Sequence, residues 1–200
     1  MRRCVEYVLL LLATTLIAIT VLHYIGDHKH EAIIEDLGRL VTACREGTKY
    51  VATKSYNVID KQVVITVKVG NSPIVVHVCN RSVVIASELI GSGVVLGSDY
   101  ISTSYGVYAY YNSASKPGPL IVEPCIVYRR KGSSIAITIV KLPPRIEPGI
   151  YGFRARKFVY SRAFSSPVNY RVYVDGRLVD SFTSRTMVLE VIEKYLVRLR

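Results

Sequence analysis

The chain has 200 residues, a formal net charge of +11 at pH 7 and a hydrophobic content of 50%. This apolar content, with neither an internal repeat nor a disordered linker, excludes an intrinsically disordered or repetitive chain. The sequence also lacks a Cys-x-x-Cys pair, a phosphate-binding glycine loop and a Gly-x-Ser-x-Gly elbow. We therefore expect a protein that is not an enzyme, that needs no cofactor and that takes no evident small-molecule substrate.

Residues 1–26 have the composition of a transmembrane anchor. Arg2 and Arg3 precede an almost uninterrupted apolar run over residues 8–22, and no small-residue cleavage site follows it. A helix needs about 20 apolar residues to cross a bilayer, and basic residues on its short side favour a cytoplasmic location for that side. The sequence therefore predicts a single-pass protein of the cell membrane, with its N-terminus in the cytoplasm and its head outside the cell.

The order of residues before the apolar run carries a family resemblance. The segment Cys4-Val5-Glu6-Tyr7 resembles the start of archaeal type IV pilin-like proteins with class III signal peptides, although Cys4 stands where that family has serine. The resemblance implies a subunit of a cell-surface filament in which Glu6 and Tyr7 take part in assembly, with Glu6 setting the register. The alternative places Glu6 in a solvated first helical turn and makes Tyr7 an interfacial anchor.

Residues 27–48 continue the helical pattern. Ile33, Leu37, Leu40 and Cys44 recur at a spacing of four and three, which is typical of an amphipathic helix with one buried face. Joined to the anchor, this segment would form one long N-terminal helix. A membrane anchor followed by a separate juxtamembrane helix is the alternative.

From residue 49 onward the pattern changes to β. Residues 62–69 alternate between apolar and polar, a turn follows, and Ile74, Val76 and Val78 are expected to face the core of the next strand. Asp175-Gly176 suits a type I′ hairpin turn. Residues 187–200 fit a helix, with a last strand as the alternative.

The expected fold class is therefore α+β, in a single-pass membrane protein. A long N-terminal helix, made of the anchor (1–26) and its amphipathic extension (27–48), would precede an antiparallel β-sandwich-like head (49–200).

Basic and aromatic residues suggest a contact surface on the head. The candidates for a partner or nucleic-acid surface are Arg154, Arg156, Lys157, Arg162, Tyr108 and Tyr110. Arginines beside aromatic rings can bind a phosphate backbone. A solvated basic strand face, or one complementary to an acidic neighbour, is the interpretation we favour.

The remaining candidates concern covalent chemistry outside the cell. Cys44, Cys79 and Cys125 could form one disulfide or stay as buried thiols, and Asn80 begins an N-glycosylation sequon. His77 alternates onto the strand face of Cys79, but two such residues alone are a weak sign of catalysis, and no metal site is expected.

The sequence thus favours a type IV pilin-like, possibly minor, subunit of an archaeal filament. It would act by assembly and surface contact, with the membrane and other pilin-like subunits or envelope proteins as partners. The alternative is a permanently anchored envelope protein whose β-rich head binds a protein partner or a polymer.

Overall fold

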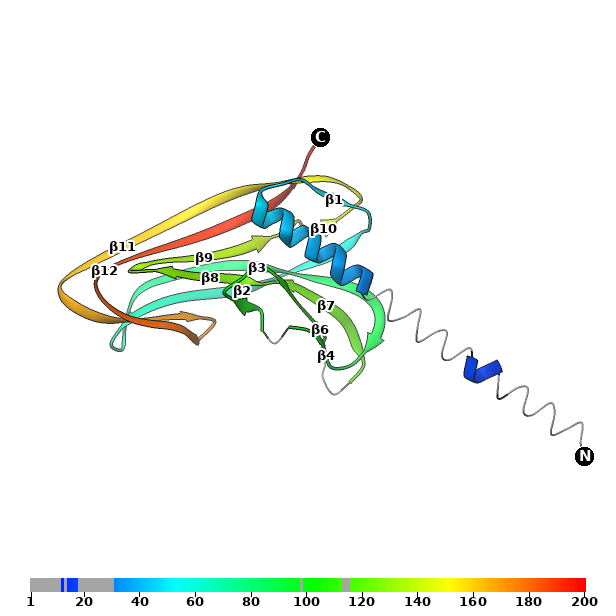
Figure 1. Cartoon of the computed structure of the whole chain (residues 1–200), viewed down its shortest axis with the longest axis horizontal. Helices are drawn as coiled ribbons and strands as arrows, with labels where there is room; N and C mark the ends of the chain where they lie inside the picture. The colour runs from blue at the N-terminus through cyan, green and yellow to red at the C-terminus, as the bar shows by residue number, and fades with distance from the viewer. Residues whose placement is uncertain (1–11, 13, 18–30, 98, 113–115) are drawn as a thin grey trace, which may run out of the picture.

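The computed structural model describes residues 12, 14–17, 31–97, 99–112 and 116–200, and most of these lie in β strands (Figure 1). Strand accounts for 68% of the structure and helix for 13%. Among the described residues, 12, 14–17 and 31–46 are helical, in two short helices. The prediction of an α+β protein with a long N-terminal helix is therefore wrong, because the apolar residues of this chain lie mainly in strands.

The predicted membrane span also requires correction. Among the described residues, no helix is both long enough and apolar enough to cross a membrane. Single-pass anchoring and a location in the cell membrane are accordingly not supported. Most of the segment 1–26, with Glu6 and Tyr7, lies outside the described residues, as do the first four residues of the predicted extension (27–48).

In the part of the chain that the structure describes, twelve strands form one mixed sheet, in the order β4-β6-β7-β3-β2-β11-β12-β9-β8-β5, with β1 paired to β11 and β10 paired to β2. The strands are β1 (Tyr50–Ala52), β2 (Tyr56–Val69), β3 (Ser72–Gly91), β4 (Val94–Leu96), β5 (Ile101–Ser102), β6 (Val107–Tyr111), β7 (Gly118–Pro124), β8 (Ile126–Lys131), β9 (Ser134–Lys141), β10 (Arg145–Ile146), β11 (Gly149–Val174) and β12 (Arg177–Arg198).

The sheet is mixed because two of its pairings are parallel. β12 runs parallel to β9, and β5 runs parallel to β8, whereas the other pairs are antiparallel. A purely antiparallel head, as the sequence suggested, is therefore wrong. The hairpin between β11 and β12 turns at Asp175 and Gly176, with φ of 51° and 77°, as a type I′ turn requires.

The C-terminal segment is a strand rather than a helix. β12 extends to Arg198, and Met187, Leu189 and Val191 alternate as fully buried residues along it. This period of two places them on one face of the sheet. The helical alternative for residues 187–200 is therefore wrong, and the strand alternative is correct.

The long strand β11 joins two layers of the sheet. It pairs with β12 over both Tyr151–Ala163 and Val168–Val174, and its last part, Tyr170–Val174, also pairs with β2 along the other edge. The register against β12 shifts between Ala163 and Val168, where Figure 1 shows the β11–β12 ribbon bending round to the lower layer. One core cluster fills the space between the layers, combining Val63, Ile65 and Val67 of β2 with Ile135, Ile137 and Ile139 of β9 and the buried residues of β12.

The helix at 31–46 covers a second core cluster at the other end of the layers (Figure 1). Leu37, Leu40, Val41 and Cys44 form its buried face and pack against residues of β1, β2, β3, β7 and β9. Apolar burial on one stripe is what holds a single surface helix in place.

Candidate functional site

The two layers leave an open side between the edges of β3 and β11. β3 pairs with β2 from Ser72 to Ile85, but with β7 only from Val84 onward. No described strand covers the second edge of β3 before that point. The second edge of β11 is likewise uncovered between its pairings with β1 and β2. A groove of about 570 Å³ lies here, lined by five consecutive residues of β3, 76–80, and by Arg156, Phe158 and Tyr160 of β11.

Side chains of β3 alternate between the outside and the interior along this groove. His77 and Cys79 are 6% and 8% exposed, whereas Val76 and Val78 are 55% and 53% exposed. The prediction that Val76 and Val78 face the core is therefore wrong. The register shows why: Val67 pairs with Val75 and Lys68 pairs with Pro73, so Ile74 is an extra, bulged residue that reverses the alternation.

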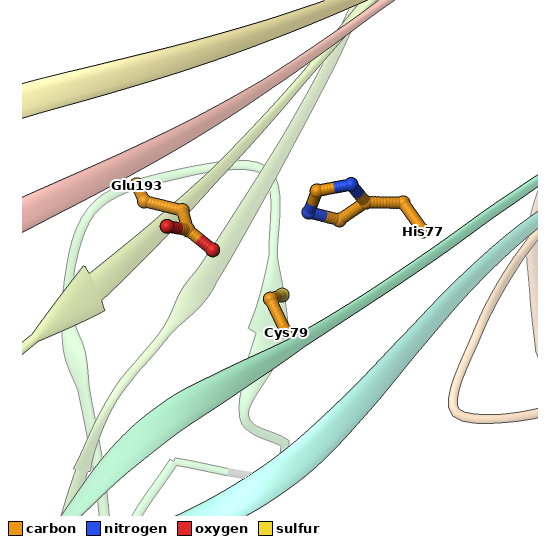
Figure 2. Close-up of side chains that lie close together, drawn as sticks. All are labelled: His77, Cys79 and Glu193. Atoms are coloured by element: carbon orange, nitrogen blue, oxygen red, sulfur yellow. The ribbon is translucent and has the colours of Figure 1, made fainter.

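His77 and Cys79 meet Glu193 of β12 inside the groove. One potential ligand atom from each residue lies within 4.8 Å of the other two. Figure 2 shows the Nε2 edge of the His77 ring facing Glu193 and Cys79. The sequence pattern brought only His77 and Cys79 together. Glu193 was missed because it lies in the segment where we expected a helix, although it follows Leu189 and Val191 at a strand period.

The imidazole of His77 is held by its other nitrogen. Nδ1 lies 2.8 Å from the Tyr160 hydroxyl, while the buried Nε2 has no hydrogen-bond partner among the described residues. The His77 ring also packs against Phe158, with ring centroids 4.8 Å apart. Burial lowers the pKa of His77, so the ring is neutral near pH 7. Burial raises the pKa of Cys79 to about 11, so its sulfur is a thiol at that pH.

Glu193 is fixed by two partners from the groove wall. The ammonium of Lys141 lies 3.1 Å from one carboxylate oxygen, and the Tyr195 hydroxyl donates to the other. Burial alone would lower the pKa of Lys141, but the hydrogen bond and the charge of Glu193 outweigh it and raise that pKa. Glu193 is therefore an oriented carboxylate, 3% exposed, beside a neutral imidazole and a thiol.

The predicted basic residues do not form one surface. Arg154, Arg156, Lys157 and Arg162 are all exposed on β11, but Lys157 lies on the opposite face of the strand from the three arginines. Lys157 pairs with Glu190 at 2.7 Å. Of the four, only Arg156 lines the groove, where its guanidinium lies 4.6 Å from the Phe158 ring centroid.

The predicted tyrosines belong to a different site. Tyr108 and Tyr110 of β6 stack at 4.9 Å between ring centroids, away from the β11 arginines. The Tyr110 hydroxyl donates to the buried carboxylate of Glu123 at 2.8 Å. Tyr110 thus takes part in a buried polar network, and the structure does not join it to the basic residues.

The other candidates are placed as follows. Cys44, Cys79 and Cys125 are all buried and free, so the disulfide considered from the sequence is not formed. Asn80 is exposed at the rim of the groove, where a sequon asparagine is accessible. Glu6 and Tyr7, the residues of the family resemblance, lie outside the described part of the chain.

No protein-family model, no curated protein and no solved structure matches this chain.

Proposed function

We propose that this protein is a non-catalytic binding module that captures an extended, acidic segment of a partner protein by strand addition to β3. The observation that carries the proposal is the uncovered edge of β3 between Ser72 and Val83. An uncovered edge presents a row of unpaired backbone donors and acceptors, which is a template for another strand. Assembly through Glu6 in a pilin-like filament stays a separate prediction.

The two edges beside the groove differ in how well they are protected. Basic side chains and prolines on an edge strand discourage pairing with other chains. β11 carries Arg154, Arg156 and Arg162 along its open stretch, with Pro167 at its end. β3 has its one proline, Pro73, near its start and Arg81 near the end of its open stretch, and it carries no Asp, Glu, Lys or Arg from Ser72 to Asn80. The edge of β3 is therefore the one available for pairing.

Charge defines the chemistry of the partner. Residues 149–200 contain ten Lys and Arg residues against four Asp and Glu residues, a local net charge of +6. Arg156, which lines the groove, makes no ion pair with any residue that the structure describes. An acidic segment would satisfy this guanidinium and would be attracted by the surrounding positive potential.

Side-chain alternation defines the order of residues in that segment. A strand added to β3 would place every second side chain beside the exposed Val76 and Val78, and the others toward Arg156 and the interior. The preferred segment is therefore extended, with apolar and acidic residues at alternate positions.

The test uses the full chain and a synthetic peptide of alternating valine and glutamate, followed by fluorescence anisotropy. This peptide should bind at least about tenfold more tightly than one in which lysine replaces every glutamate, a difference of about 1.4 kcal/mol. Backbone N-methylation at alternate residues should abolish binding because it removes the donors that pair with β3. Equal binding of both peptides, binding of neither, or tighter binding of a single-stranded oligonucleotide would overturn the proposal.

A matched pair of variants locates the bound strand. Val78→Lys places a charge on the β3 edge and should weaken peptide binding by about tenfold or more. Leu178→Lys makes the same change at a residue of similar exposure, 56%, near the β11–β12 turn, and should leave binding unchanged. Both side chains are exposed, so neither change should unfold the protein.

A further inference from the structure

We propose that His77, Cys79 and Glu193 form a binding site for a zinc ion, which goes beyond the binding of a partner strand. The three residues come from two different layers of the sheet, β3 and β12, so a shared metal would tie the open side of the molecule together. The site needs no bound partner, and it can be tested with the metal alone.

The ligand set has the composition and spacing that zinc requires. Imidazole nitrogen, thiolate sulfur and carboxylate oxygen are the three side-chain ligand types of protein zinc sites. At zinc–ligand bonds of about 2.0–2.3 Å, the ligand atoms of a tetrahedral site lie roughly 3.3–3.8 Å apart. The three atoms here lie within 4.8 Å of one another, so closure by about 1 Å completes the set. Calcium and magnesium prefer oxygen ligands and fit this set poorly.

The unpaired Nε2 of His77 points to a ligand independently of the ligand-atom spacing. A buried polar atom without a partner costs about 1–3 kcal/mol, so native structures rarely contain one. Nε2 of His77 is such an atom, and it faces Cys79 and Glu193 (Figure 2). In the tautomer whose Nδ1–H donates to the Tyr160 hydroxyl, Nε2 carries a lone pair, and this is the usual second-shell arrangement of a metal-bound histidine.

The charges around the site are compatible with a divalent cation. Binding releases the thiol proton of Cys79 to solvent, and the resulting thiolate and the Glu193 carboxylate together neutralise Zn²⁺. A carboxylate oxygen has lone pairs for both a hydrogen bond and a metal, so Lys141 and Tyr195 can keep their contacts with Glu193. Lys141 and Arg156 are the cations that face the site, and they limit its affinity.

Three protein ligands leave one coordination position of tetrahedral zinc for water or for a group in the groove. Cobalt(II) takes the same ligands and adds an optical signal.

Titrating the reduced full chain with Co²⁺ should produce a near-ultraviolet thiolate-to-cobalt absorption that saturates at one ion per chain. Added Zn²⁺ should abolish it. Cys79→Ser should remove this absorption and weaken Zn²⁺ binding by tenfold or more, whereas Cys125→Ser, the same change at another buried free thiol, should leave both unchanged. Loss of the thiolate-to-cobalt absorption in Cys125→Ser, or its absence from the unmodified chain, would overturn the proposal of a zinc site.

Two further measurements keep the test independent of folding defects. X-ray absorption of the unmodified, zinc-loaded chain should show one sulfur at about 2.3 Å and nitrogen or oxygen ligands at about 2.0–2.2 Å. A zinc coordination shell without sulfur would exclude Cys79 as a ligand. Tyr160→Phe removes only the hydroxyl that holds Nδ1 and should lower zinc affinity by about tenfold or more without removing the thiolate absorption.

Discussion

Replacing Glu123 by alanine should lower the free energy of unfolding by about 3–5 kcal/mol, because it leaves a buried arginine without its counter-charge. Glu123 is 1% exposed on β7, and its carboxylate accepts hydrogen bonds from Arg81, Lys61 and Tyr110. Arg81 is itself only 7% exposed. Urea unfolding followed by circular dichroism measures the change as a lower midpoint.

The reason for so large an effect is desolvation rather than attraction. The guanidinium of Arg81 lies 4.1 Å from the Tyr100 ring centroid, and its Nε has no hydrogen-bond partner among the described residues. Glu123 is thus its anionic partner, and an unpaired buried charge is far more costly than a missing surface pair. Replacing Glu123 also leaves the hydroxyl of Tyr110 without its hydrogen-bond acceptor. Burial raises the pKa of Tyr110 most, and the hydrogen bond to Glu123 raises it further.

Lys61→Met is the matched control, because Lys61 contacts the same carboxylate from a side chain that is 40% exposed. It should cost less than about 1 kcal/mol, as solvent screens that pair. The double variant Arg81→Met with Glu123→Leu should recover most of the loss, since no buried charge remains. Equal losses in Glu123→Ala and Lys61→Met would mean that burial does not decide the energetics of this network.

Local elements of the fold could be predicted from the sequence. The alternation over residues 62–69 predicts β2, and Asp175-Gly176 predicts the β11–β12 turn, because pleat period and positive φ are properties of a few adjacent residues. The buried stripe of the helix at 31–46 was likewise visible as Ile33, Leu37, Leu40 and Cys44, of which Leu37, Leu40 and Cys44 are buried.

The pairing of strands that are distant in the chain could not be predicted from the sequence. β12 pairs in parallel with β9, and nothing local to either segment encodes which strand it will meet. The apolar residues Val188, Ile192 and Tyr195 suit a helical face, yet Met187, Leu189 and Val191 are the buried set, since tertiary contacts favoured the strand. The bulge at Ile74 shows the same limit on a smaller scale, because one extra residue exchanged the two faces of β3.

For the same reason, only part of the candidate site could be predicted from the sequence. His77 and Cys79 are two residues apart on one strand, so their shared face follows from the pleat. Glu193 joins them only because β11 folds the sheet back and brings β12 opposite β3. The orphaned Nε2 and the free edge of β3 are properties of that folded sheet, and no pattern in the sequence reports either.

Replacing Asp36 by alanine is the second change with a large expected effect, about 2–6 kcal/mol in the free energy of unfolding. Asp36 is 3% exposed on the helix at 31–46, and its carboxylate accepts hydrogen bonds from Tyr50 at 3.0 Å and Tyr56 at 2.7 Å. Removal leaves two buried hydroxyls without an acceptor, at about 1–3 kcal/mol each. Burial raises the pKa of both tyrosines most, and the nearby carboxylate of Asp36 raises it further. Both hydroxyls are therefore protonated donors near neutral pH.

The consequence should be local as well as global, because these hydrogen bonds join the helix to β1 and β2. Amide hydrogen exchange should accelerate in the helix more than in β9 or β12 of Asp36→Ala, since the helix loses two of its hydrogen bonds to the sheet while the other core cluster is untouched. The hydrogen bond from Lys194 Nζ of β12 to the Cys44 carbonyl stays in place. Glu35→Ala alters the adjacent exposed carboxylate, whose pair with Arg39 is solvated, and should change stability by less than about 0.5 kcal/mol. If the two variants lost equal stability, or if exchange accelerated uniformly, the hydrogen bonds of Asp36 would not be what attaches the helix to the sheet.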